Sequence, residues 1–312
     1  MTSKSPTILF FGNERLATGV TTTAPTLSAL IDAGYSVAAV IVNNENTASR
    51  KSRDLEIQAV AELHNIPVHA PQKLGDMEQI LVDAHADIGV LVAYGKMVPQ
   101  KVIDLFPFGI VNIHPSLLPL HRGPTPIESV ILDGSEKSGV SIMSLASGMD
   151  AGPVYAHAQI DLTGTETKQE LADTLLDMGS TTLMAVLPGI LDGSVVAAPQ
   201  DHQRATYDLL IQKQDGILDL SKPAKQIERE IRAYAAWPKS RIKINGIDIV
   251  ITKAKALAES GPPEKVKITK DELILHTTNG SITVEELIPA GKKNMPVKAF
   301  LAGYRNQLTP TL

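Results

Sequence analysis

The chain has 312 residues, of which 43% are hydrophobic and 20% are charged. This composition is typical of a soluble globular protein and excludes a disordered or fibrous one, and the length allows one large domain or two modest ones. Because the chain contains no cysteine, disulfides, thiolate zinc sites, iron–sulfur clusters and cysteine nucleophiles are excluded.

The longest apolar runs, such as residues 88–94, are far shorter than the roughly 20 residues that a membrane-spanning helix needs. Residues 1–12 show no signal-peptide pattern. We therefore expect a cytoplasmic protein with no membrane partner.

The formal net charge of -5 hides an uneven distribution. Residues 207–312 contain 17 Lys and Arg against 12 Asp and Glu, a net +5, whereas residues 1–206 carry a net -10. A basic second part predicts either nucleic-acid binding or an ordinary solvated surface, and the charge alone does not decide between them.

Short apolar runs alternate with amphipathic stretches through the first half. Most runs are β-branched and bounded by Gly, Pro or Asn, which is typical of strands. The expected strands are residues 7–11, 36–42, 67–70, 88–93, 109–114, 139–145 and 154–160. Helical spacing of apolar residues predicts helices over residues 25–33, 54–64, 73–86 and 167–187, the last ending at Pro188-Gly189.

The pattern changes after this last helix. Residues 192–205 lack helical periodicity and contain Gly and Pro, which is typical of a connection between domains. One helix is expected over residues 223–234. Alternating runs separated by turn residues then predict strands over residues 241–244, 247–254, 266–268, 272–277 and 281–287.

The predicted fold class is therefore α/β. It combines an N-terminal Rossmann-like domain with a mostly parallel sheet and a smaller C-terminal OB-like β-barrel domain. We place the first domain at residues 1–190, a linker at residues 191–206 and the second domain at residues 207–312. In sheets of the first kind, sites form beyond the carboxyl ends of the strands.

Asn112 and His114 lie two residues apart on one expected strand, so their side chains face the same side. Pro115 ends that strand, which places both side chains at its carboxyl end, where a cleft is expected. The alternative is a buried, hydrogen-bonded histidine beside a strand-end asparagine, with no part in catalysis.

Asp150 lies in a glycine-rich turn, residues 147–153. A carboxylate beside an imidazole and an amide can move a proton and stabilise an oxyanion, which suits acyl transfer to an amine without a covalent enzyme intermediate. Ser116 lacks the GxSxG context of a serine nucleophile. The eight histidines show no metal-ligand spacing, so no metal is expected.

Four segments together resemble the folate-dependent formyltransferases: residues 93–95 (AYG), 112–119 (NIHPSLLP), 122–123 (RG) and 148–152 (GMDAG). Within that family, the second half is similar to the methionyl-tRNA formyltransferases. The segments that carry this similarity are residues 212–216 (QKQDG), 231–234 (IRAY), 237–238 (WP) and 289–295 (PAGKKNM). The similarity runs from residue 8 to about residue 307.

The resemblance implies transfer of a formyl group from 10-formyltetrahydrofolate to the α-amino group of initiator methionyl-tRNA, by a monomer and for translation initiation. It implies that Asn112 and His114 polarise the formyl carbonyl and that Asp150 orients His114 and accepts a proton. It also assigns folate contacts to Val92, Ala93, Tyr94, Gly95, Met97, Ser116, Leu117, Leu118, Pro119, Gly148 and Met149.

Two basic clusters are candidates for tRNA contact. Arg50, Lys51 and Arg53 lie in a loop of the otherwise acidic first part. Lys239, Arg241 and Lys243 alternate along one expected strand. For both clusters the alternative is a solvated surface.

The chain departs from the family pattern in three places. Residues 12–14 read Gly-Asn-Glu where the family has Gly-Thr-Pro, the basic loop at residues 43–53 is short, and Pro124-Thr125 replaces small residues. These departures concern the loop that approaches the acceptor and the shape of the folate loop.

Three other functions stay open. A sugar-nucleotide N-formyltransferase would use the same three catalytic residues but needs a nucleotide pocket, and a formyl-folate hydrolase usually carries a further domain. A non-catalytic RNA-binding module on the same fold is the third. The basic second half favours RNA over a nucleotide sugar, and the intact Asn112, His114 and Asp150 argue against a non-catalytic module.

Overall fold

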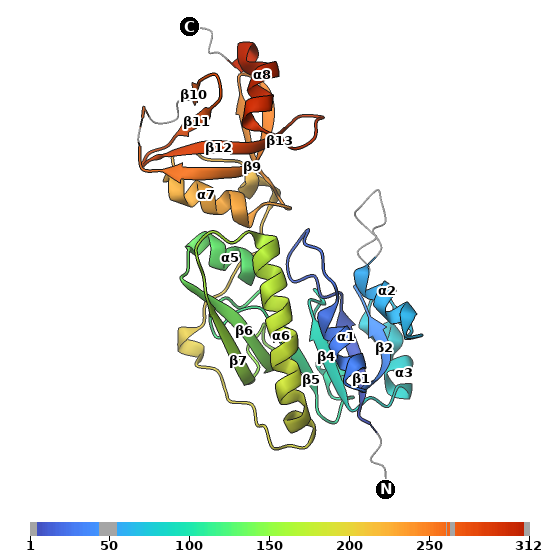
Figure 1. The fold of residues 1–312 in the computed structure, drawn as a ribbon. Helices are drawn as coiled ribbons and strands as arrows, with labels where there is room; N and C mark the ends of the chain where they lie inside the picture. The colour runs from blue at the N-terminus through green and yellow to red at the C-terminus, as the bar shows by residue number, and fades with distance from the viewer. Residues whose placement is uncertain (1–4, 44–54, 260, 263–265, 309–312) are drawn as a thin grey trace. The chain divides into compact units, whose positions relative to one another are not determined.

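The computed structural model describes residues 5–43, 55–259, 261–262 and 266–308 (Figure 1). The chain forms two compact units. The first comprises Met1–Ile127, Glu136–Leu162 and Gln169–Leu209, and the second comprises Glu128–Ser135, Thr163–Lys168 and Leu210–Leu312.

A seven-stranded sheet with the order β3-β2-β1-β4-β5-β6-β7 forms the first unit. Its strands are β1 (Thr7–Gly12), β2 (Ser36–Ile41), β3 (Val68–His69), β4 (Ile88–Val92), β5 (Ile110–His114), β6 (Lys137–Ser144) and β7 (Val154–Asp161). The pairings from β3 to β5 are parallel, and β6 and β7 run antiparallel to their neighbours. All seven expected strands are present.

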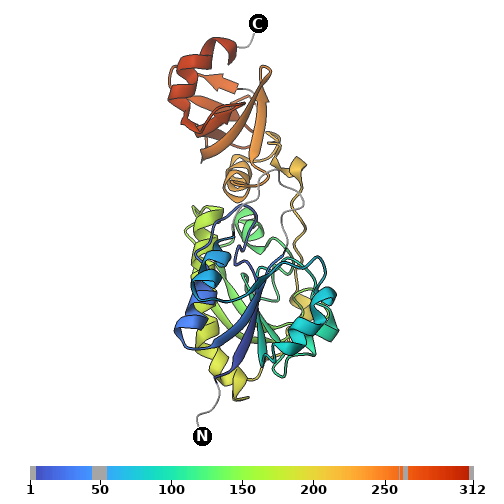
Figure 2. The ribbon, with the colours of Figure 1, turned by 90° about the vertical axis from the view of Figure 1, so that its right-hand side faces the viewer.

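Helices cover both faces of this sheet (Figure 2). They are α1 (Pro25–Asp32), α2 (Glu56–Leu63), the 3-10 turn η2 (Leu74–Met77), α3 (Glu78–Asp83), α4 (Gln100–Ile103) and α6 (Lys168–Leu191). Leu9 and Phe11 of β1 pack with α3 and α4, whereas Ile8 and Phe10 are buried on the opposite face. The alternation along one strand therefore fills two layers of core. Helix α4 was not predicted.

Helix α6 extends past Pro188 to Leu191, so the predicted end at Pro188-Gly189 is wrong. Leu187 and Ile190 are buried, and this packing outweighs the hydrogen bond that Pro188 cannot donate. By length and composition alone α6 could cross a membrane, contrary to the expectation that no stretch qualifies. A buried core helix passes the same criterion, and Leu175 and Leu183 of α6 are fully buried.

The loop after β1 is held by Glu14, one of the residues that departs from the family pattern. Its carboxylate accepts hydrogen bonds from the backbone N–H groups of Thr26 (2.9 Å) and Leu27 (2.8 Å). These groups lie at the start of α1, where Ala24 offers no capping side chain, so Glu14 supplies the cap from a distance. Burial raises the pKa of Glu14 to about 7.

The second unit is built on a six-stranded antiparallel sheet in the order β10-β11-β12-β9-β8, with β13 paired to β12. Its strands are β8 (Ser240–Ile244), β9 (Ile247–Leu257), β10 (Val266–Ile268), β11 (Leu273–His276), β12 (Ser281–Pro289) and β13 (Met295–Pro296). The sheet is curled and consistent with an OB-like fold. The predicted fold class is therefore confirmed.

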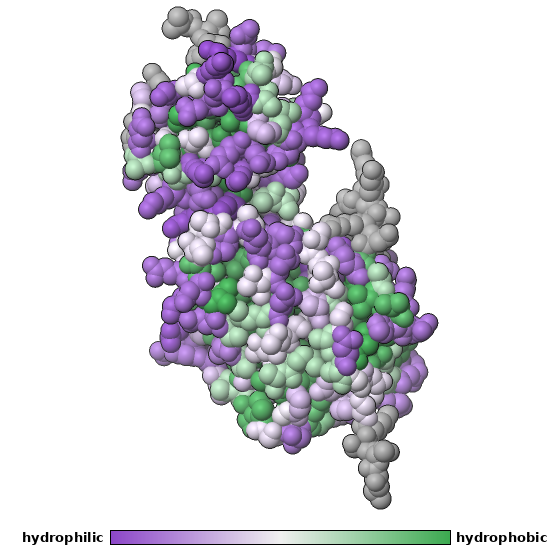
Figure 3. Space-filling view, in the orientation of Figure 1, coloured by the Kyte–Doolittle hydropathy of each residue, from purple (hydrophilic) through white to green (hydrophobic). Residues whose placement is uncertain are grey.

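Helices α7 (Ala224–Ala233) and α8 (Val297–Leu308) pack against this sheet, and α8 was not predicted. The core between them contains Ile227, Ile251 and Phe300. Hydrophilic side chains cover much of the face of this unit that Figure 3 shows.

Two segments from the first half of the chain belong to the second unit. One is most of α5 (Pro126–Asp133), which was not predicted, and the other is Thr163–Lys168. The Nζ atom of Lys168 lies 3.4 Å from Oε1 of Glu128 on α5, and both side chains are buried. Lys168 also donates to the carbonyl oxygen of Trp237. Burial lowers the pKa of Lys168, an effect that the Glu128 carboxylate opposes.

Candidate functional site

Asn112 and His114 lie at the carboxyl end of β5, where 6% and 4% of their surfaces are exposed. The apolar neighbours Val111 and Ile113 are buried and fix the strand in the core. Among the residues that the structure describes, the Asn112 side chain has no hydrogen-bond partner. Its amide N–H groups can therefore donate to a bound molecule.

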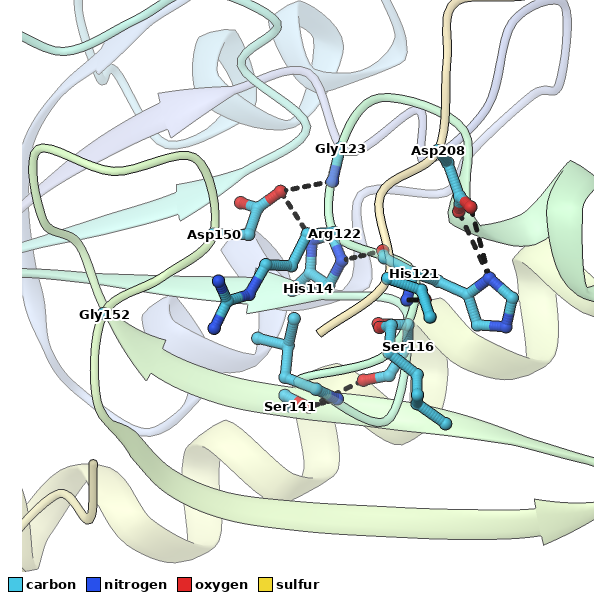
Figure 4. Close-up of polar contacts among 12 residues, drawn as sticks. His114, Ser116, His121, Arg122, Gly123, Ser141, Asp150, Gly152 and Asp208 are labelled. Atoms are coloured by element: carbon cyan, nitrogen blue, oxygen red, sulfur yellow. Dashed lines mark hydrogen bonds and ion pairs between the residues drawn. The ribbon is translucent and has the colours of Figure 1, made fainter. Parts of the chain in front are cut away.

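His114 is held from both ends of its ring (Figure 4). Its Nε2 atom lies 2.9 Å from the carbonyl oxygen of His121, and a carbonyl oxygen only accepts, so Nε2 carries a proton. Its Nδ1 atom lies 3.8 Å from Oδ2 of Asp150. In the neutral imidazole, Nδ1 therefore presents a lone pair to this carboxylate.

The Asp150 carboxylate points toward both His114 and Gly123 (Figure 4). The backbone N–H of Gly123 donates to Oδ2 at 2.8 Å. Gly123 has a φ of +115°, and a Cβ atom there would lie 2.6 Å from the carbonyl oxygen of Asp208. Only glycine fits at this position, which explains the glycine of the Arg-Gly motif.

These groups can carry proton transfer and oxyanion stabilisation. Nδ1 and Oδ2 face each other at 3.8 Å, so a positive charge on the imidazole would be stabilised by the carboxylate. Asn112 adds a neutral donor on the same strand. Clusters of three or more His, Asp or Glu that could hold a metal ion do not occur in the described part of the chain.

The loop after β5 is anchored by the buried Ser141 of β6. Its Oγ donates to the carbonyl oxygen of Ser116 (2.6 Å) and accepts from the N–H of Leu118 (3.0 Å). The Nδ1 atom of His157 lies 2.9 Å from the same Oγ and must be the donor there, since the hydroxyl hydrogen is already used. Burial lowers the pKa of His157, which favours this neutral ring.

The predicted folate residues fall into two groups. Side chains of four are buried: Val92, Tyr94, Ser116 and Leu118. The Tyr94 ring packs edge-on against Phe11 in the core, and burial raises its pKa to about 12. Ala93, Leu117 and Pro119 are half-buried and Gly95 and Gly148 exposed, while Met97 and Met149 are 68% and 51% exposed.

Two of the three predicted tRNA residues of the second unit line a hollow of about 990 Å³. Arg241 and Lys243 of β8 line it together with Lys213, and Lys239 is exposed just before β8. The Nη2 atom of Arg241 donates to the carbonyl oxygen of Lys213. Arg50, Lys51 and Arg53 lie outside the described residues.

Sequence reasoning missed the group that lies next to Asp150. The buried Arg122 was seen only as part of a motif, and Gln200, which contacts it, was placed in a linker. Ser141 and His157 were also missed. The pairing of β6 with β7 brings these two residues together, and no local spacing in the sequence reveals that pairing. A polar residue within an apolar strand, as Ser141 is in β6, was the available signal.

Comparisons with known proteins identify the same family along most of the chain. The sequence profile "Formyl transferase" matches residues 15–187, and "Formyl transferase, C-terminal domain" matches residues 210–305. The chain is 36% identical over 306 residues to the methionyl-tRNA formyltransferase of Chloroflexus aurantiacus, covering 95% of this chain and 96% of the relative. It is 34% identical over 288 residues to that of Bacillus licheniformis, covering 89% and 91%.

Solved structures with this fold are more distant in sequence. An N-formyltransferase of Helicobacter canadensis, in complex with folinic acid and dTDP-3-aminofucose, has a TM-score of 0.68 at 16% identity, covering 90% of this chain and 99% of that one. HypX of Aquifex aeolicus with tetrahydrofolic acid has a TM-score of 0.61 at 16% identity, covering 95% and 47%.

Proposed function

Because the chain belongs to the formyl transferase family, we propose that it transfers the formyl group of 10-formyltetrahydrofolate to the α-amino group of initiator methionyl-tRNA. The observation that carries the proposal is that the side chains of Asn112, His114 and Asp150 lie close together. They form one polar cluster at the end of β5, with the Asn112 amide unpaired among the described residues. Similarity to methionyl-tRNA formyltransferases over nearly the whole chain supports the choice of acceptor.

The reaction needs an oxyanion donor and a proton carrier. The neutral amine attacks the formyl carbon, and the resulting tetrahedral adduct carries a negative oxygen and a positive nitrogen. The Asn112 amide donates to that oxygen. Asp150 accepts the proton from the attacking nitrogen, and the same proton returns to N10 of the folate as the bond between carbon and N10 breaks.

We assign to His114 a role other than the polarisation of the formyl carbonyl that the family resemblance implies. Both of its ring nitrogens face protein groups, His121 on one side and Asp150 on the other. We therefore assign oxyanion donation to Asn112. His114 serves as the partner that stabilises the proton while Asp150 holds it.

We assign catalysis to residues 1–190, a connecting role to residues 191–206 and tRNA binding to residues 207–312. The hollow beside β8 supports the last assignment, because it combines three cationic side chains with apolar walls such as Ile249 and Ile288. Arg50, Lys51 and Arg53 would add contacts to the acceptor end. We also infer that the protein acts in the cytoplasm as a monomer, with no membrane partner.

A formyl-transfer assay tests the proposal. The purified protein is given 10-formyltetrahydrofolate and, in parallel, initiator methionyl-tRNA or a dTDP-linked amino sugar. We expect formylation of the tRNA at least about 1,000-fold faster than of the sugar, because a mismatched acceptor leaves polar groups unpaired. Preferential formylation of the sugar would make the chain a sugar-nucleotide N-formyltransferase instead.

A further inference from the structure

Arg122 is a cation with almost no contact with solvent: 1% of its surface is exposed. Its Nη1 donates to the Tyr207 hydroxyl at 2.8 Å, and its Nε and Nη2 donate to Oε1 of Gln200 at 3.2 and 2.7 Å. Its Nη2 also lies 3.0 Å from Nδ1 of His202, which must accept because a guanidinium only donates. None of these three partners is a carboxylate.

Gln200 joins Arg122 to the turn that carries Asp150. Its Oε1 takes the two bonds from Arg122, and its Nε2 donates to the carbonyl oxygens of Asp150 and Gly152, both at 2.7 Å. All the bonding capacity of the amide is used, and its orientation is fixed, because a flipped amide would point its N–H groups at the guanidinium.

The turn is consequently held from two sides by neighbouring residues of one loop. Gly123 donates to the Asp150 carboxylate, and Arg122 orients the amide that binds the Asp150 carbonyl. Asp150 itself has a φ of +46°, a conformation that a non-glycine residue keeps only when its surroundings impose it.

We propose that Arg122 and Gln200 are positioning residues that fix the distance between the Asp150 carboxylate and the His114 ring. The inference rests on the proposed function, since it matters for catalysis only if Asp150 carries the proton. Neither residue touches the reacting atoms. Both act through the backbone of residues 150–152.

The sharpest test is Gln200→Glu. The new carboxylate matches Gln200 in size and still accepts from Arg122, but it cannot donate to the two carbonyl oxygens of the turn. We expect kcat for formyl transfer to fall about 10- to 100-fold when it is normalised to the concentration of enzyme that binds folate. A displacement of a catalytic group by about 1 Å lowers the rate by a factor of this size. KM for 10-formyltetrahydrofolate and for methionyl-tRNA should change less than about three-fold.

Asp201→Ala is the matched control. Asp201 follows Gln200 and its side chain accepts from the N–H of Gln203 only within its own exposed turn. We expect wild-type kcat for this variant. A loss equal to that of Gln200→Glu would mean that any disturbance of the segment lowers the rate, and would overturn the positioning role.

Arg122→Lys gives an independent result if Gln200→Glu does not fold. Lysine keeps the charge and loses the forked contact with Oε1, so we expect a smaller fall in kcat with KM unchanged, and a larger fall for Arg122→Met. Wild-type kcat in the folded Gln200 or Arg122 variants overturns the inference while leaving the proposed function intact, provided that Asp150→Asn is inactive. Activity of Asp150→Asn would instead overturn the proposed function.

Discussion

The Nδ1 atom of His114 lies 3.8 Å from Oδ2 of Asp150, the same oxygen that accepts from the N–H of Gly123. This separation is longer than a hydrogen bond, so the two groups interact as an ion pair when the imidazole is protonated and face each other as two acceptors when it is neutral. In the mechanism that we propose, this pair holds the proton that is removed from the attacking amine.

Asp150→Asn removes the proton acceptor and keeps its shape. We expect kcat to fall about 100- to 10,000-fold with little change in folate affinity. Steady-state kinetics and equilibrium binding of 10-formyltetrahydrofolate measure the two effects separately. Asp208→Asn is the control, because Asp208 contacts the His121 ring and does not contact His114. Near-normal turnover of Asp150→Asn would remove Asp150 from the mechanism.

Asn112→Asp tests the oxyanion donor. The carboxylate keeps the size of the side chain, cannot donate and repels a developing negative oxygen. We expect kcat to fall about 100- to 1,000-fold, the usual effect of losing one such donor, with KM for the folate changed much less. If kcat stays at the wild-type value, another group must stabilise the oxyanion.

Ser141→Ala tests the anchoring of the loop that follows β5. The substitution leaves the carbonyl oxygen of Ser116 and the N–H of Leu118 without their buried partner, so we expect a loss of about 1 to 3 kcal/mol in the free energy of unfolding. KM for 10-formyltetrahydrofolate should rise. Ser138→Ala on the same strand is a matched control, because the buried Ser138 hydroxyl has no partner among the described residues. Equal effects of the two substitutions would contradict the anchoring role.

The pKa of Glu14 predicts a dependence of stability on pH. Its value of about 7 in the folded protein exceeds the ordinary 4.5, so the folded state binds the proton more tightly and stability falls as pH rises between these values. The unfolding free energy of the wild type, relative to Glu14→Gln, should drop by about 3 kcal/mol from pH 4.5 to pH 8. Denaturant unfolding at a series of pH values measures this, with the exposed Glu62→Gln as control. A pH-independent difference would contradict the prediction.

Lys243→Ala tests the tRNA surface. Removal of one phosphate contact should weaken tRNA binding and reduce the slope of log K against log salt by about 0.7 to 0.9. The control is Lys255→Ala, because the Nζ of Lys255 already lies 2.8 Å from a carboxylate oxygen of Glu285. Binding titrations at several salt concentrations give both slopes. An unchanged slope for Lys243→Ala would exclude this residue from the interface.

The sequence predicted that Asn112 and His114 lie together because a period of two on one strand places them on the same side, and because their neighbours matched a known family. It did not reveal what holds the cluster. The partner of Arg122 lies 78 positions along the chain, in a segment without periodicity. Helix α8 was missed although the sequence offered a signal for it, because Val297, Phe300, Leu301, Tyr304 and Leu308 have helical spacing and pack in one core.

The segment that follows α6 stays in the first unit as far as Leu209, before the chain enters the second. Ala198 pairs with Val154, Tyr207 pairs with Arg122, and the carbonyl oxygen of Leu209 accepts from the Thr125 hydroxyl. A chimera that exchanges C-terminal domains between relatives should therefore be joined after Leu209. A junction near residue 191 would import a foreign residue at position 200 and with it different contacts to the carbonyl oxygens of Asp150 and Gly152.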